Sequence, residues 1–279
     1  MNKLTKSLFH SAAMTFALTT ATGALATPIT PTVKMTFERS SLFPAGNLVT
    51  NIQLNTEFNS RPEVNSNVLA GMFGGQASEG AGFDEKTLYR NNNDVLAYCI
   101  DILENLLTGS GGAVYDVKPV GSGTETTDGV TRNFGRMLDF LGAANTVAEE
   151  EYGLEFGSLN WLNPAPGGWM SAAFQIGIWE SLYEEVTENP LSITTGWFRA
   201  GSARRGEGTD FGKAAEFLED AFSEMNDPAF GNRLDASTVR WLQIDGGQDL
   251  LVDPSEVPVP GTLLLTAAGL GLLRYRKKS

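Results

Sequence analysis

The sequence predicts an α+β fold in which a helical section is inserted into a β-sandwich. Three observations lead to this class. Short segments with alternating apolar residues fill the first part of the body, apolar residues at helical spacing fill its middle, and two short apolar runs end it. The chain has 279 residues, of which 42% are hydrophobic and 19% charged. This is enough apolar material for one packed domain with additional terminal segments.

The first part of the body is predicted to be rich in strands because apolar and polar residues alternate there. Strands are expected at 33–37, 48–54, 68–73, 94–100 and 113–120. Gly71, Gly74 and Gly75 predict bulges in or beside the third of these strands. The polar residues 124–129 predict a loop.

Helical periodicity follows. Three amphipathic helices are expected, with apolar positions within 134–141, 174–186 and 211–222. The carboxylates of the second helix are expected to form a solvated face; they are Glu180, Glu184, Glu185 and Glu188. The apolar runs 239–244 and 250–252 predict a final hairpin, because Asp245-Gly246-Gly247 between them is a favourable turn sequence.

Residues 1–26 are typical of a secretory signal peptide. Lys3 and Lys6 precede an apolar stretch, and small residues at 24–26 form the expected cleavage site after Ala26. The alternative is a buried N-terminal helix. The order of the charged, apolar and small-residue regions favours export of the chain.

The C-terminal segment, residues 254–279, combines a Pro-x-Pro box, an apolar stretch and a basic end. The sorting motif consists of Val257, Pro258, Val259, Pro260, Arg274 and Arg276. This tail resembles the PEP-CTERM sorting signal of Gram-negative bacteria that carry an exosortase. The resemblance implies an exosortase-type processing enzyme as a partner, anchorage of the short helix in the inner membrane before processing, and a final location at the cell surface or outside the cell. The alternative is an ordinary C-terminal membrane anchor.

Charge and composition exclude several functions. The formal net charge is -13, and loss of the two basic tails would make the body between residues 27 and 253 more acidic still. Such a surface repels phosphate backbones, so we expect no nucleic-acid partner. The single histidine, His10, lies in the predicted signal peptide, which excludes a Ser-His-Asp triad, a Cys-His dyad and a histidine-ligated zinc site from the mature protein.

Two segments of the body carry possible chemistry. The single cysteine lies in Tyr98-Cys99-Ile100-Asp101, at the end of a predicted strand. An unpaired cysteine is unusual in an exported protein and is either buried or functional. The second segment, Gln175-Ile176-Gly177-Ile178-Trp179, lies near the start of a predicted helix. Alone, Cys99 would be a small core residue and Gln175 a surface residue.

Together these two segments resemble the internal-thioester domains of bacterial surface adhesins. The resemblance touches most of residues 68–252. It implies a thioester between Cys99 and Gln175, in an environment that includes Tyr98, Asp101, Phe174 and Trp179. It implies no catalytic residue, metal or cofactor. Backbone N–H groups at the start of the helix are expected to polarise the Gln175 carbonyl, and aromatic neighbours are expected to exclude water.

The function expected from these features is single-use covalent adhesion. An amine or hydroxyl nucleophile on a surface glycan or protein would open the thioester and stay attached through Gln175. Because the bond is consumed, the protein would not be an enzyme. One alternative is a non-reactive structural protein of an extracellular matrix or biofilm, with a buried free Cys99. Another is a secreted carbohydrate-active enzyme with paired carboxylates, for which no convincing acid pair is found.

Overall fold

The computed structural model describes residues 30–54, 64–82, 88, 94–102, 104–127, 130–154, 167–184, 191–202, 208–231 and 233–252. The predicted signal peptide and the predicted sorting segment, with Val257, Pro258, Val259, Pro260, Arg274 and Arg276, lie outside the described residues. Within the described ranges, no helix has both the length and the apolar character needed to cross a membrane.

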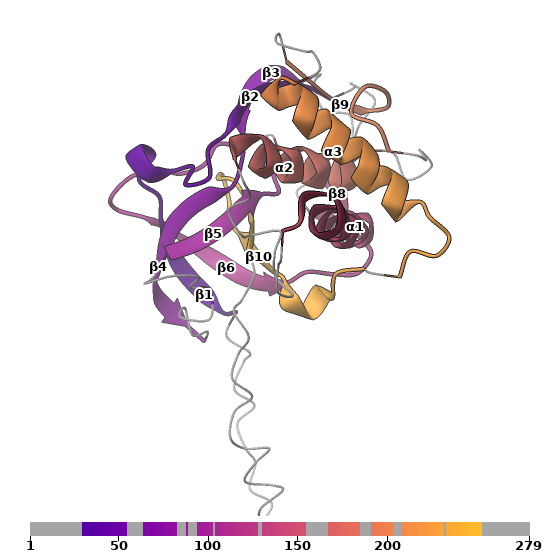
Figure 1. Cartoon of the computed structure of the whole chain (residues 1–279). Helices are drawn as coiled ribbons and strands as arrows, with labels where there is room; N and C mark the ends of the chain where they lie inside the picture. Colours follow the sequence, from indigo (N-terminus) through magenta and orange to yellow (C-terminus); the bar gives the residue numbers. More distant parts are fainter. Residues whose placement is uncertain are drawn as a thin grey trace, which may run out of the picture.

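Six strands close into a barrel (Figure 1). In barrel order they are β1 (Thr32–Thr36), β4 (Phe73–Ala81), β5 (Asp94–Cys99), β11 (Leu250–Val252), β10 (Arg240–Gln243) and β6 (Ala113–Pro119). All neighbouring pairs are antiparallel, and β1 closes the barrel by pairing with both β4 and β6. The expected β-sandwich is therefore wrong, although the mixture of strands and helices is confirmed. Alternation of apolar residues specifies one buried face and is the same in a sandwich and in a barrel.

A smaller sheet lies beside the barrel and contains β3 (Val64–Ala70), β2 (Leu48–Leu54) and β9 (Phe198–Gly201) in that order. The expected strand 68–73 is instead the junction between β3 and β4, which belong to different sheets. Gly71 permits this junction because a Cβ atom there would lie 2.8 Å from the backbone oxygen of Gly46. The segment expected to be a loop at 124–129 contributes to a hairpin of β7 (Thr124–Thr127) and β8 (Val130–Asn133).

The three predicted helices lie between β8 and β10, two of them before β9 and one after it. They are α1 (Phe134–Tyr152), α2 (Gly168–Tyr183) and α3 (Asp210–Met225). Two short 3-10 helices are also present: η1 (Arg39–Ser41) follows β1, and η5 (Ala236–Thr238) precedes β10. The side chain of Asn133 caps α1 by accepting a hydrogen bond from the Arg136 N–H, and Thr209 caps α3 in the same way through Gly212.

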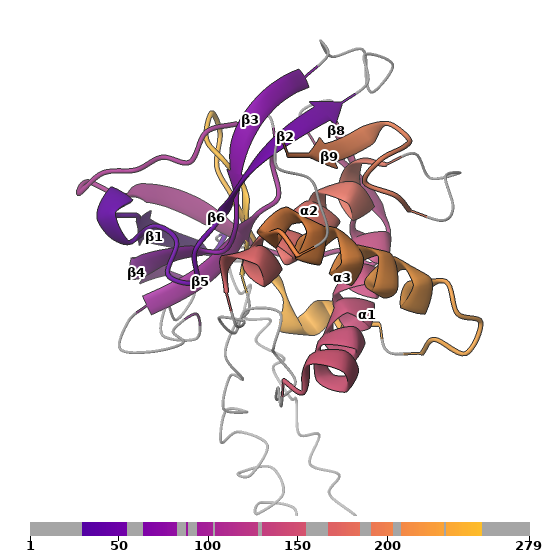
Figure 2. The same cartoon turned by 45° about the horizontal axis from the view of Figure 1, so that its top comes forward.

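Helix α2 is buried on all sides rather than amphipathic. Every residue from Met170 to Tyr183 is buried, because α2 packs against α1, α3 and the strands β3, β8 and β9 (Figure 2). A helix that is apolar around its whole circumference belongs in the interior of a domain. Helix α2 is thus the central element between the barrel and the outer helices.

The carboxylates of α2 are also not solvated as predicted. Glu180 and Glu184 are 0% and 3% exposed. Glu180 accepts a hydrogen bond from the Ser192 N–H, and Glu184 accepts bonds from the N–H groups of Trp197 and Phe198. They hold the segment that leads into β9 against the end of α2. Glu185 and Glu188 lie outside the described residues.

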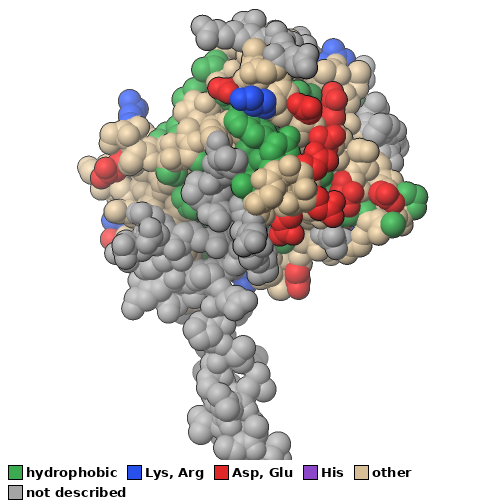
Figure 3. Space-filling view, in the orientation of Figure 1, with side chains coloured by type: hydrophobic (Ala, Val, Ile, Leu, Met, Phe, Trp, Pro, Cys, Tyr) green, Lys and Arg blue, Asp and Glu red, His purple; other side chains and the backbone are tan. Residues whose placement is uncertain are grey.

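The outer helices α1 and α3 carry an acidic face (Figure 3). Figure 3 shows acidic side chains gathered over the region of α1 and α3. Among the exposed members are Glu150 and Glu151 at the end of α1 and Glu216 and Glu219 on α3. An acidic face of this kind repels other anions.

The packing of α2 on α1 depends on a glycine. A Cβ atom at Gly177 would overlap the ring of Phe140 on α1. We expect Gly177→Ala to lower the free energy of unfolding by about 1–3 kcal/mol, because the two helices would have to separate. Denaturant unfolding followed by circular dichroism measures this change. The matched control is Gly111→Ala, where no atom lies within 4 Å; equal stabilities of the two variants would contradict the prediction.

Candidate functional site

One face of α2 contacts the end of β5 and the residues that follow it. Ser171, Gln175, Trp179 and Tyr183 are spaced by four residues, so they lie one above the other along the helix. All four side chains are buried. They point toward the short segment 98–101, which begins within the last residues of β5. The site is therefore built from one helix face and one strand end.

Gln175 pairs with the main chain of Cys99. The Gln175 Nε2 donates to the Cys99 carbonyl oxygen at 2.8 Å, and the Cys99 N–H donates to the Gln175 Oε1 at 2.8 Å. Both residues are 0% exposed. The two bonds fix the carboxamide carbon of Gln175 beside the cysteine that lies 76 residues earlier in the chain. The structure thus brings together the two residues that the sequence singled out.

The sulfur of Cys99 lies in a desolvated position. Its Sγ–H donates to the Asp101 carbonyl oxygen at 2.8 Å. Burial raises the pKa of the thiol well above its ordinary value, and the negative charge of Asp101 raises it further. The indole N–H of Trp179 opposes this rise, although its geometry falls short of a hydrogen bond. Cys99 is consequently a neutral thiol at physiological pH rather than a thiolate.

The oxyanion site differs from the one expected. Gln175 is the eighth residue of α2, whose first residue is Gly168, so the N–H groups at the helix start cannot reach its carbonyl. The donor on the Gln175 Oε1 is instead the N–H of Cys99. A backbone N–H in that position would stabilise negative charge on the oxygen during attack at the carboxamide carbon.

Aromatic side chains enclose one side of the pair. Tyr98 and Phe174 are buried with their ring centroids 6.3 Å apart, and Phe174 continues into contacts with Phe140 and Phe217 of the outer helices. Burial raises the pKa of the Tyr98 phenol, whereas its hydrogen bond to Ser171 lowers it. Both rings therefore contribute to a water-poor environment for the Cys99–Gln175 pair.

A buried ion pair holds the segment that follows Cys99. The Arg132 Nη2 lies 3.1 Å from the Asp101 Oδ2, and the Arg132 Nε donates to the Tyr183 hydroxyl at 3.3 Å. The same hydroxyl donates to the Ile100 carbonyl oxygen at 2.9 Å. These contacts join β8, the end of α2 and the strand end around the cysteine. They fix the Asp101 carbonyl that accepts the bond from the thiol.

The hairpin of β10 and β11 contributes two further polar residues. The Gln248 Nε2 donates to the Asp101 carbonyl oxygen at 2.9 Å, so this oxygen accepts from both Gln248 and the thiol. The Asp249 carbonyl accepts from the Ile100 N–H, and its Oδ1 accepts from the Ile244 N–H. Burial raises the pKa of the Asp249 carboxyl from 3.8 to about 6, against the opposing effect of the Ile244 N–H.

The residues predicted to surround Cys99 and Gln175 lie near this pair, but they play different roles. Tyr98, Phe174 and Trp179 enclose it, while Asp101 provides the backbone acceptor for the thiol and pairs with Arg132 through its side chain. Sequence reasoning gave no role to Ser171, Arg132, Tyr183, Gln248 or Asp249. For Ser171 and Tyr183 a signal existed, because both continue the four-residue spacing from Gln175.

Among the described residues, no group of His, Cys, Asp or Glu side chains is arranged to hold a metal ion. Comparison of the chain with protein-family models, with curated proteins and with solved structures gives no match.

Ionisation of Asp249 should make stability depend on pH. The carboxyl ionises near 3.8 when unfolded but near 6 when folded, so the folded state binds more protons between these values. The free energy of unfolding therefore falls as pH rises through this window, by at most about 3 kcal/mol. Asp249→Asn keeps an acceptor for Ile244 and should reduce this fall. Denaturant unfolding at several pH values measures it.

The control for this experiment is Asp245→Asn, which removes an exposed carboxyl from the same turn. We expect its pH profile to follow that of the wild type. An Asp249→Asn profile that coincides with the wild type would contradict the assignment of this titration to Asp249.

Proposed function

We propose that this chain is an exported protein that forms an internal thioester between Cys99 and Gln175 and uses it to attach covalently to a nucleophile on a surface glycan or protein. The proposal includes export through the signal peptide 1–26. It also includes processing of the segment 254–279 by an exosortase-type enzyme after temporary anchorage in the inner membrane of a Gram-negative bacterium.

One observation carries the proposal: the buried carboxamide of Gln175 is held on the main chain of Cys99 by two reciprocal hydrogen bonds of 2.8 Å. A buried side-chain amide normally forms hydrogen bonds, and any nearby polar group can serve as its partner. Here the partner is the single cysteine of the chain, and the N–H on the carboxamide oxygen is that of the cysteine itself. This arrangement supports the proposal because it holds the Gln175 carboxamide beside the residue whose sulfur would attack its Cδ.

The reaction balances without a cofactor or an oxidant. The Cys99 Sγ bonds to the Gln175 Cδ, the bond from Cδ to Nε2 breaks, and the amide nitrogen leaves as ammonia with the proton of the thiol. A primary amine then attacks Cδ, the bond from Cδ to Sγ breaks, and a proton of the amine returns to the sulfur. The products are a secondary amide on Gln175 and the Cys99 thiol.

The environment suits a neutral thioester better than a charged sulfur. Burial and the Asp101 charge raise the pKa of the Cys99 thiol, so a thiolate is disfavoured there. A thioester carries no charge, so desolvation costs it far less free energy than it costs a thiolate. We therefore expect the bond to be long-lived until a partner binds, and its formation to require a proton acceptor near the sulfur.

The mass of the protein tests the proposal. We expect purified residues 27–253 to be lighter than their sequence by one ammonia, and methylamine to add one methylamine to that mass because it opens the thioester. Alkylation under denaturing conditions should find no thiol before treatment and one afterwards. Intact-mass spectrometry with peptide mapping measures both and assigns the adduct to Gln175.

Cys99→Ala serves as the matched control, because it should keep the Gln175 amide and show neither the mass deficit nor the adduct. An unmodified wild-type mass with one titratable thiol would contradict the proposal. It would leave the second candidate, a structural matrix protein in which Cys99 is a packed core residue; complete burial of this thiol is the observation that favours that candidate.

Trp179 should protect the thioester from water. Its side chain is 3% exposed and acts on the pKa of the neighbouring thiol. We expect Trp179→Ala to shorten the half-life of the ammonia-deficient form by roughly tenfold, because water then reaches the bond. Time-resolved intact mass at neutral pH measures this. Trp169→Ala, which removes a partly buried tryptophan near the start of the same helix, is the control; equal half-lives of the two variants would show that Trp179 is not the barrier.

A further inference from the structure

Strand β3 is an unprotected edge. In the described part of the chain it pairs with β2 on one side and with no strand on the other (Figure 2). Proteins usually protect such an edge with a charge, a proline or a very short strand. The seven residues of β3, Val-Asn-Ser-Asn-Val-Leu-Ala, include neither a charge nor a proline. The opposite edge of this sheet, β9, has only four residues and carries Arg199.

A pocket of about 460 Å³ runs along this edge. Four consecutive residues of β3, from Ser66 to Leu69, line it. Because successive strand residues point to opposite faces, a pocket lined by all four reaches the edge of β3, where backbone groups are presented. The lining also includes Ile52 of the neighbouring strand β2, so the pocket extends from the edge over one face of the sheet. Asn65, Ser66 and Asn67 are exposed, and Leu69 is 48% exposed. Among the described residues, none pairs with this edge, and its side chains are accessible to another chain.

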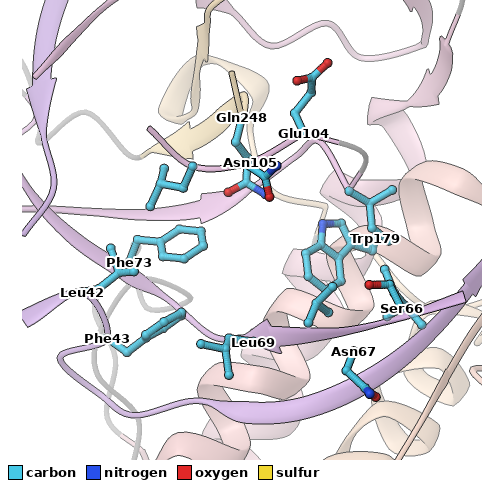
Figure 4. Close-up of a pocket in the computed structure, with 14 residues that line it drawn as sticks. Leu42, Phe43, Ser66, Asn67, Leu69, Phe73, Glu104, Asn105, Trp179 and Gln248 are labelled. Carbon is cyan, nitrogen blue, oxygen red and sulfur yellow. The ribbon is translucent and has the colours of Figure 1, made fainter. Parts of the chain in front are cut away.

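The same pocket adjoins the thioester site. Its lining includes Trp179, which influences the Cys99 thiol, and Gln248, which shares the Asp101 carbonyl with that thiol. Figure 4 shows the Trp179 indole between Glu104 and Asn105 on one side and Ser66 and Asn67 on the other. The indole thus belongs both to the lining of the pocket and to the surroundings of the Cys99 thiol.

Charge favours an amine in this pocket. Glu104 is the charged residue of its lining, and the whole chain has a formal charge of -13. A lysine side chain has a long apolar stem and a cationic end. The apolar lining residues Leu42, Phe43 and Phe73 suit the stem, and Glu104 suits the cation before it loses its proton for attack.

We infer that the target is an extended polypeptide that pairs with the free edge of β3 and places a lysine in the adjoining pocket. The inference rests on the proposed thioester, and it selects a protein over a glycan because only a polypeptide can continue the backbone ladder. The backbone bonds give affinity independent of sequence. The pocket then selects the lysine, whose amine reaches the Gln175 Cδ once the Trp179 indole has moved aside, and attacks it as described above.

Three amine probes test the inference at equal concentration. They are a soluble peptide of alternating Thr and Val with one central Lys, the same peptide with a proline on each side of the Lys, and Nα-acetyl-lysine amide. Proline removes the N–H groups that pairing needs. We expect the first peptide to form adducts on Gln175 at least about tenfold faster than the other two, because docking raises the effective concentration of its amine. Intact mass against time measures the rates.

Variants of β3 supply the matched comparison. Alternate residues of an antiparallel strand direct their N–H groups to the partner strand, so one of Ser66 and Asn67 directs its N–H to the free edge. Of the variants Ser66→Pro and Asn67→Pro, the one that removes the N–H at the free edge should keep the wild-type Tm. This variant should lose the preference for the strand peptide and keep its reaction with methylamine. Hydrogen exchange of residues 64–70 should slow in the adduct of the strand peptide but not in the methylamine adduct, and this readout needs no variant.

The outcomes separate the two proposals. Equal rates for all three probes, with methylamine adducts still formed, would overturn edge pairing and leave the thioester intact. Faster reaction with a soluble oligosaccharide than with the strand peptide would do the same and assign the pocket to a glycan. A dimer in solution that the edge proline dissociates, without preference for the peptide, would assign the edge to a second copy of the chain. Absence of any methylamine adduct would overturn the thioester, and the inference with it.

Discussion

The pairing of the Gln175 carboxamide with the main chain of Cys99 is the constraint on which the rest of the described fold depends. A buried primary amide that loses its partners costs about 1–3 kcal/mol for each unsatisfied group. Helix α2 therefore cannot rotate or shift by one residue without breaking both hydrogen bonds. That would leave the Gln175 amide and the Cys99 main-chain groups buried without partners. The register of the central helix is in this way tied to the end of β5. The barrel and the helices consequently act as one scaffold for this pair.

Neutrality is the chemical character of the site. The nearby charges are paired, as in Arg132 with Asp101, or are weakened, as in the Asp249 carboxyl with its pKa raised to about 6. The thiol is likewise held in its neutral form by burial. A buried ion pair contributes little net stability but fixes geometry, because removing one partner leaves an uncompensated charge. The proposed thioester suits such a setting, because it is neutral and because water, which would hydrolyse it, is kept away.

Local patterns predicted the elements better than their assembly. The three helices and the final hairpin were expected from apolar spacing, and the turn at Gly246 has the positive φ of 69° that favours glycine. Closure of the sheet into a barrel was not expected, because it depends on β1 pairing with β6, a strand about 80 residues later. The burial of Glu180 and Glu184 was also missed. A helical pattern shows which residues share a face, but not how many of its faces are covered.

The candidate site divides in the same way. The sequence by itself determined that histidine chemistry is excluded from the body, that one cysteine is present, and that Cys99 and Gln175 are the residues to compare, because composition and motif are properties of the chain. Only the tertiary structure decided that these two residues meet, that the donor on the carboxamide is the Cys99 N–H, and that the pocket beside Trp179 opens along β3. Contacts between residues 76 positions apart arise from packing of a helix on a strand end, and no local pattern encodes that distance.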